Sequence, residues 1–194
     1  MYECNRELNA MKQCIENGAQ AAGATLARRL LVKARKYHLT IIELECLYAI
    51  LNHVVYCVGS ELEFHQTSVE LRHVQQKLNT ETEAEIIFGA VSVKYSLIVS
   101  DHPENAPFIE ESIAKLELLI QQFDTFKIRY NYYLLRSWYG QVVRNFPKRI
   151  AACDEAIEYF RNNPSIAGNL VAIFTSEKAD CYFHLRDYEQ FLKL

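Results

Sequence analysis

The sequence predicts an all-α fold of stacked, antiparallel helical hairpins, and three observations carry this prediction. Glycine and proline are scarce, with 6 and 4 among 194 residues, so the chain lacks the many tight turns of an all-β fold. A Ser or Thr followed three residues later by Glu recurs every 20 residues, at Thr40, Ser60 and Thr80. Apolar residues at helical spacing follow each of these motifs, which is typical of successive amphipathic helices.

Each of these motifs matches a capping box that starts a helix. The hydroxyl accepts a hydrogen bond from the backbone N–H three residues on, and the Glu reaches back to the N–H of the capping residue. Asp124–Thr125 and Phe146–Pro147 mark later boundaries. These signals predict helices over residues 3–17, 20–37, 41–58, 61–78, 81–100, 106–123, 126–145, 148–162 and 166–185, and a short helix from residue 187.

The apolar faces of the predicted helices alternate in kind. The helix over 106–123 carries one narrow apolar stripe and is expected to bury one side only. The helix over 81–100 is apolar around most of its circumference, so other elements have to cover it on several sides. This alternation favours an open stack of hairpins over a closed bundle, in which every helix would carry a similar stripe.

Recurring spacings in the C-terminal third resemble those of tetratricopeptide repeats. Gly140, Ala152 and Pro164 follow one another at 12-residue offsets, as the small residues of two paired helices and the closing proline do in that family. The segment from Cys181 to Phe191 resembles the turn between the two helices of such a repeat. The matching positions there are Tyr182, Leu185, Asp187 and Tyr188.

The resemblance implies a right-handed superhelix, an α-solenoid, of about five antiparallel hairpins in a single domain over residues 1–194. Motifs similar to those of the family occur only in residues 133–194, and Arg136 and Tyr139 stand where the family prefers Trp and Leu. Leu194 falls inside the last predicted second helix. Either a short terminal helix docks there, or the chain is part of a longer protein.

The resemblance also implies a concave face that binds an extended peptide or a partner helix. The positions that align with this face are Ser137, Gln141, Arg144, Asn145, Ser176, Asp180, Phe183 and His184. A looser alignment on the Ser60 cap adds His53 and Tyr56. Arg144 is the strongest single candidate, because a guanidinium binds a carboxylate through two parallel hydrogen bonds. The alternative for each position is that it lies on an ordinary solvated part of the concave surface and binds no partner.

The net charge of −3 is unevenly distributed along the chain. Residues 61–124 contain 12 acidic and 4 basic side chains, whereas residues 125–150 contain no acidic residue. The basic residues of that second segment are Lys127, Arg129, Arg136, Arg144, Lys148 and Arg149. Either adjacent hairpins of opposite charge attract each other, or the basic segment binds an acidic or carboxylate-bearing partner.

Aromatic residues are interleaved with these basic residues, at Tyr130, Tyr132, Tyr133, Trp138 and Tyr139. They point around the whole predicted helix, so we interpret them as core residues. A peptide groove is the second interpretation. Single-stranded nucleic acid, which stacks on exposed aromatic rings beside basic residues, is disfavoured.

The sequence contains no motif for catalysis, for a cofactor or for a metal ion. It has no glycine-rich phosphate loop, no nucleophile elbow and no His-Glu-x-x-His, so we predict no enzyme, no catalytic residue and no cofactor. The six cysteines include no Cys-x-x-Cys pair, and no signal peptide or membrane span is apparent. These features predict a cytoplasmic protein that does not associate with a membrane.

We therefore expect a non-catalytic scaffold or adaptor that binds a protein or peptide segment on its concave face. One alternative is a regulatory sensor whose repeats close around a signalling peptide or a small metabolite. The other, less favoured, is a helical repeat that binds RNA.

Overall fold

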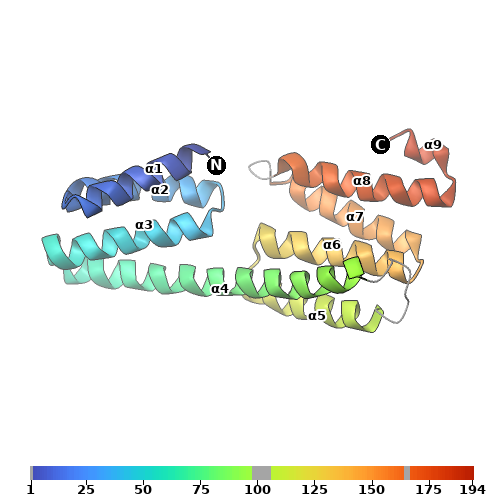
Figure 1. Ribbon diagram of the computed structural model, residues 1–194, viewed down its shortest axis with the longest axis horizontal. Helices are drawn as coiled ribbons and strands as arrows, with labels where there is room; N and C mark the ends of the chain where they lie inside the picture. Colours follow the sequence, from blue (N-terminus) through green and yellow to red (C-terminus); the bar gives the residue numbers. More distant parts are fainter. Residues whose placement is uncertain (1, 98–105, 164–166) are drawn as a thin grey trace. The chain divides into compact units, whose positions relative to one another are not determined.

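The computed structural model describes residues 2–97, 106–163 and 167–194, and all regular secondary structure in these ranges is helical (Figure 1). This confirms the predicted all-α class. Pro164 and the predicted helix end at residue 100 lie outside the described residues. The helices are α1 (Tyr2–Glu16), α2 (Gln20–Lys36), α3 (Thr40–His53), the π-helical η1 (Val54–Val58), α4 (Glu61–Leu97), α5 (Ala106–Gln122), α6 (Phe126–Val142), α7 (Phe146–Arg161), α8 (Ala167–Leu185) and α9 (Tyr188–Phe191).

The contacts of the chain group into two compact units, Met1–Asn79 and Thr80–Leu194, which we describe separately. Within each unit, helices that follow one another in sequence pack against one another. In the first unit α1 packs on α2 and α2 on α3, and in the second unit α5 packs on α6, α6 on α7 and α7 on α8. This sequential packing agrees with the predicted order of neighbouring helices.

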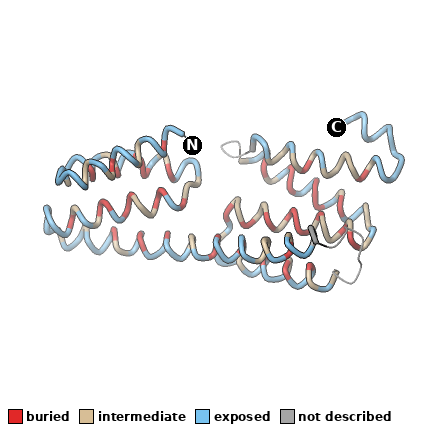
Figure 2. Tube along the Cα trace, viewed as in Figure 1, coloured by how far each residue is buried: buried red, intermediate tan, exposed pale blue. Residues whose placement is uncertain are grey.

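The core of the first unit lies between α1, α2, α3 and the first half of α4. Met11, Leu30 and Leu47 are almost completely buried there, and Leu71 and Val74 of α4 belong to the same cluster. In α2 the buried positions Ala24, Ala27, Leu30, Leu31 and Ala34 lie on one side of the helix, and intermediate and exposed positions alternate with them (Figure 2). Helix α2 is therefore amphipathic, whereas α3 is buried over more of its circumference.

Four turns between consecutive helices share one backbone geometry. A residue with left-handed conformation follows the preceding helix at Gly18, His38, Arg144 and Arg186, with φ angles of 78°, 53°, 52° and 58°. The next residue in each turn donates its backbone N–H to the carbonyl five residues back, as Asn145 does to Gly140 at 2.8 Å. This bond closes the end of the preceding helix, and the next helix begins directly afterwards.

The sequence predicts separate helices over 61–78 and 81–100, but the structure has one continuous helix, α4, through both. The prediction of a helix start at Thr80 is wrong, because no glycine or proline interrupts the helix at this point. The side chain of Thr80 is buried. The carboxylate of Glu81, which is 1% exposed, lies 3.1 Å from the amine of Lys127. Other parts of the chain therefore pack over this turn of α4 and bury it.

The other two capping motifs have different outcomes. Ser60 caps α4 as predicted, since its Oγ accepts the backbone N–H of Glu63 at 3.3 Å. Thr40, by contrast, is the first residue of α3 and not its cap. Glu43 is buried and accepts a hydrogen bond from Nε of Arg35 at 3.0 Å, so its carboxylate joins α3 to α2.

The apolar segment predicted as a helix over 41–58 forms α3 and η1. It ends at Gly59, whose φ of 67° is left-handed and whose N–H bonds to the carbonyl of Val54 at 2.8 Å. Among the described residues, the segment Thr40–Val58 is long and apolar enough to cross a membrane. Its mean hydropathy is 1.6, and 39% of it is buried. A single segment of this kind is weak evidence for a membrane, because the core helices of water-soluble proteins include similar ones.

The second unit has two apolar clusters that share α6. One lies between the second half of α4, α5 and α6, and includes Ala84, Leu116 and Leu135. The other lies between α6, α7 and α8, and includes Phe160 and Phe174, whose rings stack with centroids 5.8 Å apart. Helix α6 is therefore covered on two sides, as its nearly continuous apolar surface predicts.

Candidate functional site

A close approach between α6 and α7 positions the candidate site. A Cβ atom on Gly140 would lie 2.8 Å from Cβ of Arg149 and 2.9 Å from its backbone nitrogen. Only glycine allows the two helices to meet this closely. The contact holds the start of α7 against α6 and directs the side chain of Arg149 toward groups of α6 and α8.

Arg149 is 3% exposed and donates hydrogen bonds to three side chains. Its Nε donates to Oγ of Ser137 at 3.2 Å, its Nη1 to Oδ2 of Asp180 at 2.7 Å, and its Nη2 to Oε2 of Glu177 at 2.7 Å. The Ser137 hydroxyl in turn donates to the same Glu177 oxygen at 2.9 Å. Residues of α6, α7 and α8 are thus joined in one network, which we call the Arg149 network.

The carboxylates of Glu177 and Asp180 offset the free-energy cost of burying the Arg149 guanidinium. Burial alone would lower the pKa of Arg149, but the hydrogen bond and negative charge of Glu177 and the hydrogen bond to Asp180 hold the pKa above its ordinary value. A buried guanidinium needs this compensation, because an unpaired charge in the core would be strongly destabilising. The network therefore serves the packing of three helices.

Two buried cysteines border the Arg149 network. Sγ of Cys153 lies 3.9 Å from Oγ of Ser137, and Sγ of Cys181 donates to the carbonyl of Glu177 at 3.3 Å. Burial raises the pKa of Cys153 to about 12 and that of Cys181 to about 11. Both are therefore protonated near neutral pH, and a protonated, buried thiol is a poor nucleophile.

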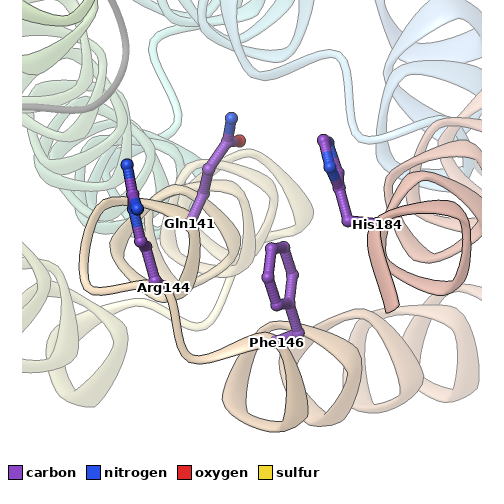
Figure 3. A pocket seen from close by; sticks show the side chains of 4 residues that line it. All are labelled: Gln141, Arg144, Phe146 and His184. Carbon is purple, nitrogen blue, oxygen red and sulfur yellow. The ribbon is translucent and has the colours of Figure 1, made fainter. Parts of the chain in front are cut away.

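A pocket opens beside the Arg149 network, where α6 ends, α7 begins and α8 ends. It has a volume of about 260 Å³ and is lined by Gln141, Arg144, Phe146 and His184 (Figure 3). The ring of Phe146 stacks on the imidazole of His184, with centroids 5.5 Å apart and an interplanar angle of 19°. We call these four residues the α6–α8 pocket.

The α6–α8 pocket and the Arg149 network share a carboxylate. Asp180 accepts from Arg149 through Oδ2, while its Oδ1 lies 3.5 Å from Nε2 of His184 one turn further along α8. Stacking on Phe146 holds the other side of the imidazole. His184 is thus positioned from two directions, although its side chain is 51% exposed.

Arg144 reaches the pocket from an unusual backbone position. Its φ of 52° is left-handed, a conformation that favours glycine, and it lies in the turn that closes α6. The next residue, Asn145, accepts the backbone N–H of Lys148 at 3.1 Å through its side chain and so caps α7. The turn is therefore well defined on both sides of Arg144.

The structure brings some of the predicted concave-face residues together. Gln141, Arg144 and His184 line the α6–α8 pocket. Ser137 is completely buried in the Arg149 network and is not part of a solvated wall, whereas Asp180 is bonded to Arg149 but is 45% exposed.

The other predicted residues do not line this pocket. Asn145 caps α7, Ser176 is exposed on α8, and Phe183 is 58% exposed with its ring against Tyr188. His53 and Tyr56 belong to the first unit. His53 is the last residue of α3, and Tyr56 lies in η1 and is 80% exposed.

Most of the basic segment is paired within the second unit. Lys127 pairs with Glu81, Arg129 with Asp124, Arg136 with Glu155, and Arg149 with Glu177 and Asp180. The pairs with Glu81 and Asp124 join the basic segment to the acidic stretch before it. This favours attraction between neighbouring hairpins as the main reason for the charge pattern.

The aromatic residues of α6 pack in the core, as we interpreted them from the sequence. Tyr133 is buried, and its ring meets Phe160 and Phe174 edge to face, with centroids 6.4 Å and 6.3 Å away. Trp138 packs on Phe88 of α4 with centroids 5.3 Å apart. These rings are therefore used in packing between helices.

Three residues of the site were not predicted as site residues. Phe146 entered the prediction as a helix boundary and Arg149 as one of several surface charges, while Glu177 was not considered. A signal for the network does exist in the sequence, because Glu177, Asp180 and His184 recur at three- and four-residue spacing and so share one face of α8.

Within the described residues, no three His, Cys, Asp or Glu side chains are grouped so that they could hold a metal ion. Comparison with known protein families, with curated proteins and with solved structures gave no match to this chain.

Proposed function

We propose that this chain is a non-catalytic binding module, a scaffold or adaptor whose hairpins form a tetratricopeptide-like, right-handed superhelix. It binds an extended segment of a protein or peptide. The observation that carries the proposal is the α6–α8 pocket, in which polar, cationic and aromatic side chains from three consecutive helices converge. A cytoplasmic location belongs to the same proposal.

The chemistry of the α6–α8 pocket suits a peptide. Gln141 offers both a donor and an acceptor, as a peptide backbone requires, and Arg144 offers donors for a carbonyl or a carboxylate. The stacked rings of Phe146 and His184 add an apolar wall. A volume of about 260 Å³ is below the usual range for sites that enclose whole small molecules, and it is suited to one side chain or one terminus of a longer ligand.

The side chain of Arg144, and not its backbone, distinguishes it from equivalent positions. His38 and Arg186 adopt the same left-handed conformation in equivalent turns, so the positive φ belongs to the turn. Of these three residues only Arg144 lines the α6–α8 pocket.

The first test uses Arg144→Gly, with Arg186→Gly as its matched control. Both residues are arginines with left-handed φ angles in equivalent turns, but only Arg144 lines the pocket. A phage-displayed library of random peptides is selected on the wild-type protein, and the affinities of the selected peptides are then measured by fluorescence anisotropy. We expect Arg144→Gly to weaken binding about tenfold or more, the value of one hydrogen bond to a charged group, and Arg186→Gly to leave it unchanged.

Thermal unfolding of both variants provides the stability control. Each is expected to be at least as stable as the wild type, because glycine relieves the turn. The proposal is wrong if no peptide is selected, or if the selected peptides bind the wild type and Arg144→Gly with equal affinity.

A further inference from the structure

The charge of the α6–α8 pocket depends on a histidine. Of the four residues that line the pocket, only His184 has a side chain of the kind that gains or loses a proton between about pH 5 and pH 8. Gln141 and Phe146 are neutral, and the guanidinium of Arg144 stays protonated. Figure 3 shows the imidazole and this guanidinium on opposite sides of the pocket. The lining therefore carries one positive charge when the imidazole is neutral and two when it is protonated.

The imidazole of His184 is held in place before any ligand arrives. Its ring stacks on Phe146 of α7, and the ring of Phe183 meets it edge to face with centroids 6.3 Å apart. Its Nε2 lies 3.5 Å from Oδ1 of Asp180, one turn earlier on α8. A proton on this ring thus adds a positive charge at a fixed position beside the pocket.

The position of Asp180 leaves Nδ1 as the ring nitrogen for a ligand. In the neutral imidazole with its proton on Nε2, which lies beside the carboxylate, Nδ1 is a hydrogen-bond acceptor. A second acceptor, such as a ligand carboxylate, is not bound by it. In the protonated imidazole both nitrogens are donors, so Nδ1 donates to a carboxylate. One proton therefore changes which chemical group the pocket binds.

The other charges around His184 are consistent with an anionic ligand. From α8, Asp180 faces the imidazole, but its other oxygen accepts a hydrogen bond from Arg149 of α7 at 2.7 Å. The turn after α6 contributes Arg144. Beyond α8, the carboxylate of Asp187 caps α9. The carboxylate beside His184 is thus paired with a buried cation, and protonation of the imidazole makes the pocket more positive.

We propose that the α6–α8 pocket binds an acidic side chain of a peptide, and that protonation of His184 strengthens this binding. The inference rests on the proposed function, because it names the group that the pocket binds and the condition that regulates it. A ligand that binds the protonated form more tightly loses affinity as pH rises through the titration of the imidazole. Above that range the affinity is expected to stay constant.

The experiment measures peptide binding at two pH values. Random peptides displayed on phage are selected on the wild-type protein at pH 5.5, and the affinity of each selected peptide is measured by fluorescence anisotropy at pH 5.5 and pH 8.0. We expect the peptides to share an Asp or Glu and to bind about fivefold or more weakly at pH 8.0, the value of one added charge near the ligand. Asn or Gln in place of the shared acidic residue is expected to remove the pH dependence.

His184→Gln and His65→Gln form a matched pair of variants. His65 of α4 also lies one turn after a carboxylate, with Nε2 4.0 Å from Glu61, but it does not line the pocket. We expect His184→Gln to bind equally at the two pH values and His65→Gln to keep the pH dependence of the wild type. Circular dichroism at both pH values checks that the variants are folded.

A measurement on the wild type does not require any variant to fold. The titration of the His184 imidazole is followed by NMR with and without a selected peptide. Because linkage is reciprocal, the bound peptide is expected to move the midpoint of this titration to higher pH. A midpoint that does not move shows that the ligand does not distinguish the two forms, and the inference is then wrong.

The other outcomes separate this inference from the proposed function. Selected peptides that lack a shared acidic residue, or that bind the wild type equally at both pH values, overturn the inference alone, provided that Arg144→Gly still weakens their binding. A pH dependence that persists in His184→Gln belongs to another group and also overturns it. If no peptide is selected, or if Arg144→Gly binds as tightly as the wild type, the proposed function is wrong and the inference is wrong with it.

Discussion

Gly140 is required by packing and not by backbone conformation. Gly18 and Gly59 have positive φ angles and no neighbour that a Cβ would meet, so they serve their turns. Gly140 has no positive φ, but a Cβ there would lie 2.9 Å from the backbone nitrogen of Arg149. Because backbone cannot move aside as a flexible side chain can, α6 and α7 would have to separate.

We expect Gly140→Ala to lower the free energy of unfolding by about 1–3 kcal/mol, the usual cost of overpacking. Gly89→Ala is the matched control, since Gly89 also lies within a helix but has open space around its Cβ position. That variant is expected to gain about 0.5–1 kcal/mol from helix propensity. Urea denaturation measures both, and equal effects of the two substitutions would contradict the close approach.

At the level of single residues, the sequence predicts local interactions better than tertiary ones. The Ser60 cap depends on residues three positions apart and was correctly predicted. Thr80 has the same local pattern, yet the helix continues through it. The roles of Ser137 and Arg149 were not predicted, because their network joins positions that are 12 to 40 residues apart in the sequence.

Among the elements, α4 departs most from what the sequence predicts. Its residues 79–82 read as a helix boundary because Asn, Thr and Glu are common at caps, but these residues continue the helix. The predicted starts and ends of α2 and α5 agree with the structure to within one residue. A glycine or a proline stands at the boundaries of those helices, and either residue interrupts a helix whatever packs around it.

Proline at position 82 tests the continuity of α4. In the first turn of a separate helix proline is tolerated, whereas within a continuous helix it removes a hydrogen bond and clashes with the preceding turn. We expect Thr82→Pro to cost about 3 kcal/mol of stability and to reduce the helical circular dichroism signal. Thr82→Ala controls for the lost side chain. If Thr82→Pro were as stable as Thr82→Ala, α4 would consist of two separate helices.

At the scale of the whole molecule, buried thiols make stability depend on pH above neutrality. Burial raises the pKa of Cys46 and Cys153 from 9.0 to about 12, and that of Cys181 to about 11. Between these values the unfolded chain loses thiol protons that the folded chain retains. The free energy of unfolding therefore falls as pH rises above about 9, by about 1.4 kcal/mol per pH unit for each thiol.

Urea denaturation at a series of pH values from 7 to 10 measures this dependence. Cys153→Ala is expected to flatten the decline in the second unit, whereas Cys57→Ser, at an exposed thiol, is expected to leave it unchanged. A free energy of unfolding that is constant up to pH 10, or a decline that Cys153→Ala does not alter, would contradict the assignment.

The sequence predicts the helical class and the order in which helices pack within each unit, because both follow from periodicity and from short connections. It predicts the candidate site only in part. Gln141, Arg144 and His184 were expected from the positions that align with the concave face of tetratricopeptide repeats, while Phe146 was missed because its contact with His184 joins α7 to α8. A pocket formed by three helices depends on the distances between those helices, and the periodicity of the sequence does not give these distances.

The Arg149 network has a consequence for how the second unit folds. In a stack of hairpins each helix mainly contacts its neighbours, so the last helices can detach one after another at low cost. Here α8 supplies both carboxylates of Arg149 and the ring of Phe174 in the core between α6, α7 and α8, so its loss would break these contacts together. Fraying from the C-terminal side should therefore stop at α9, and α6, α7 and α8 should exchange their slowest amide protons together, as a single cooperative unit.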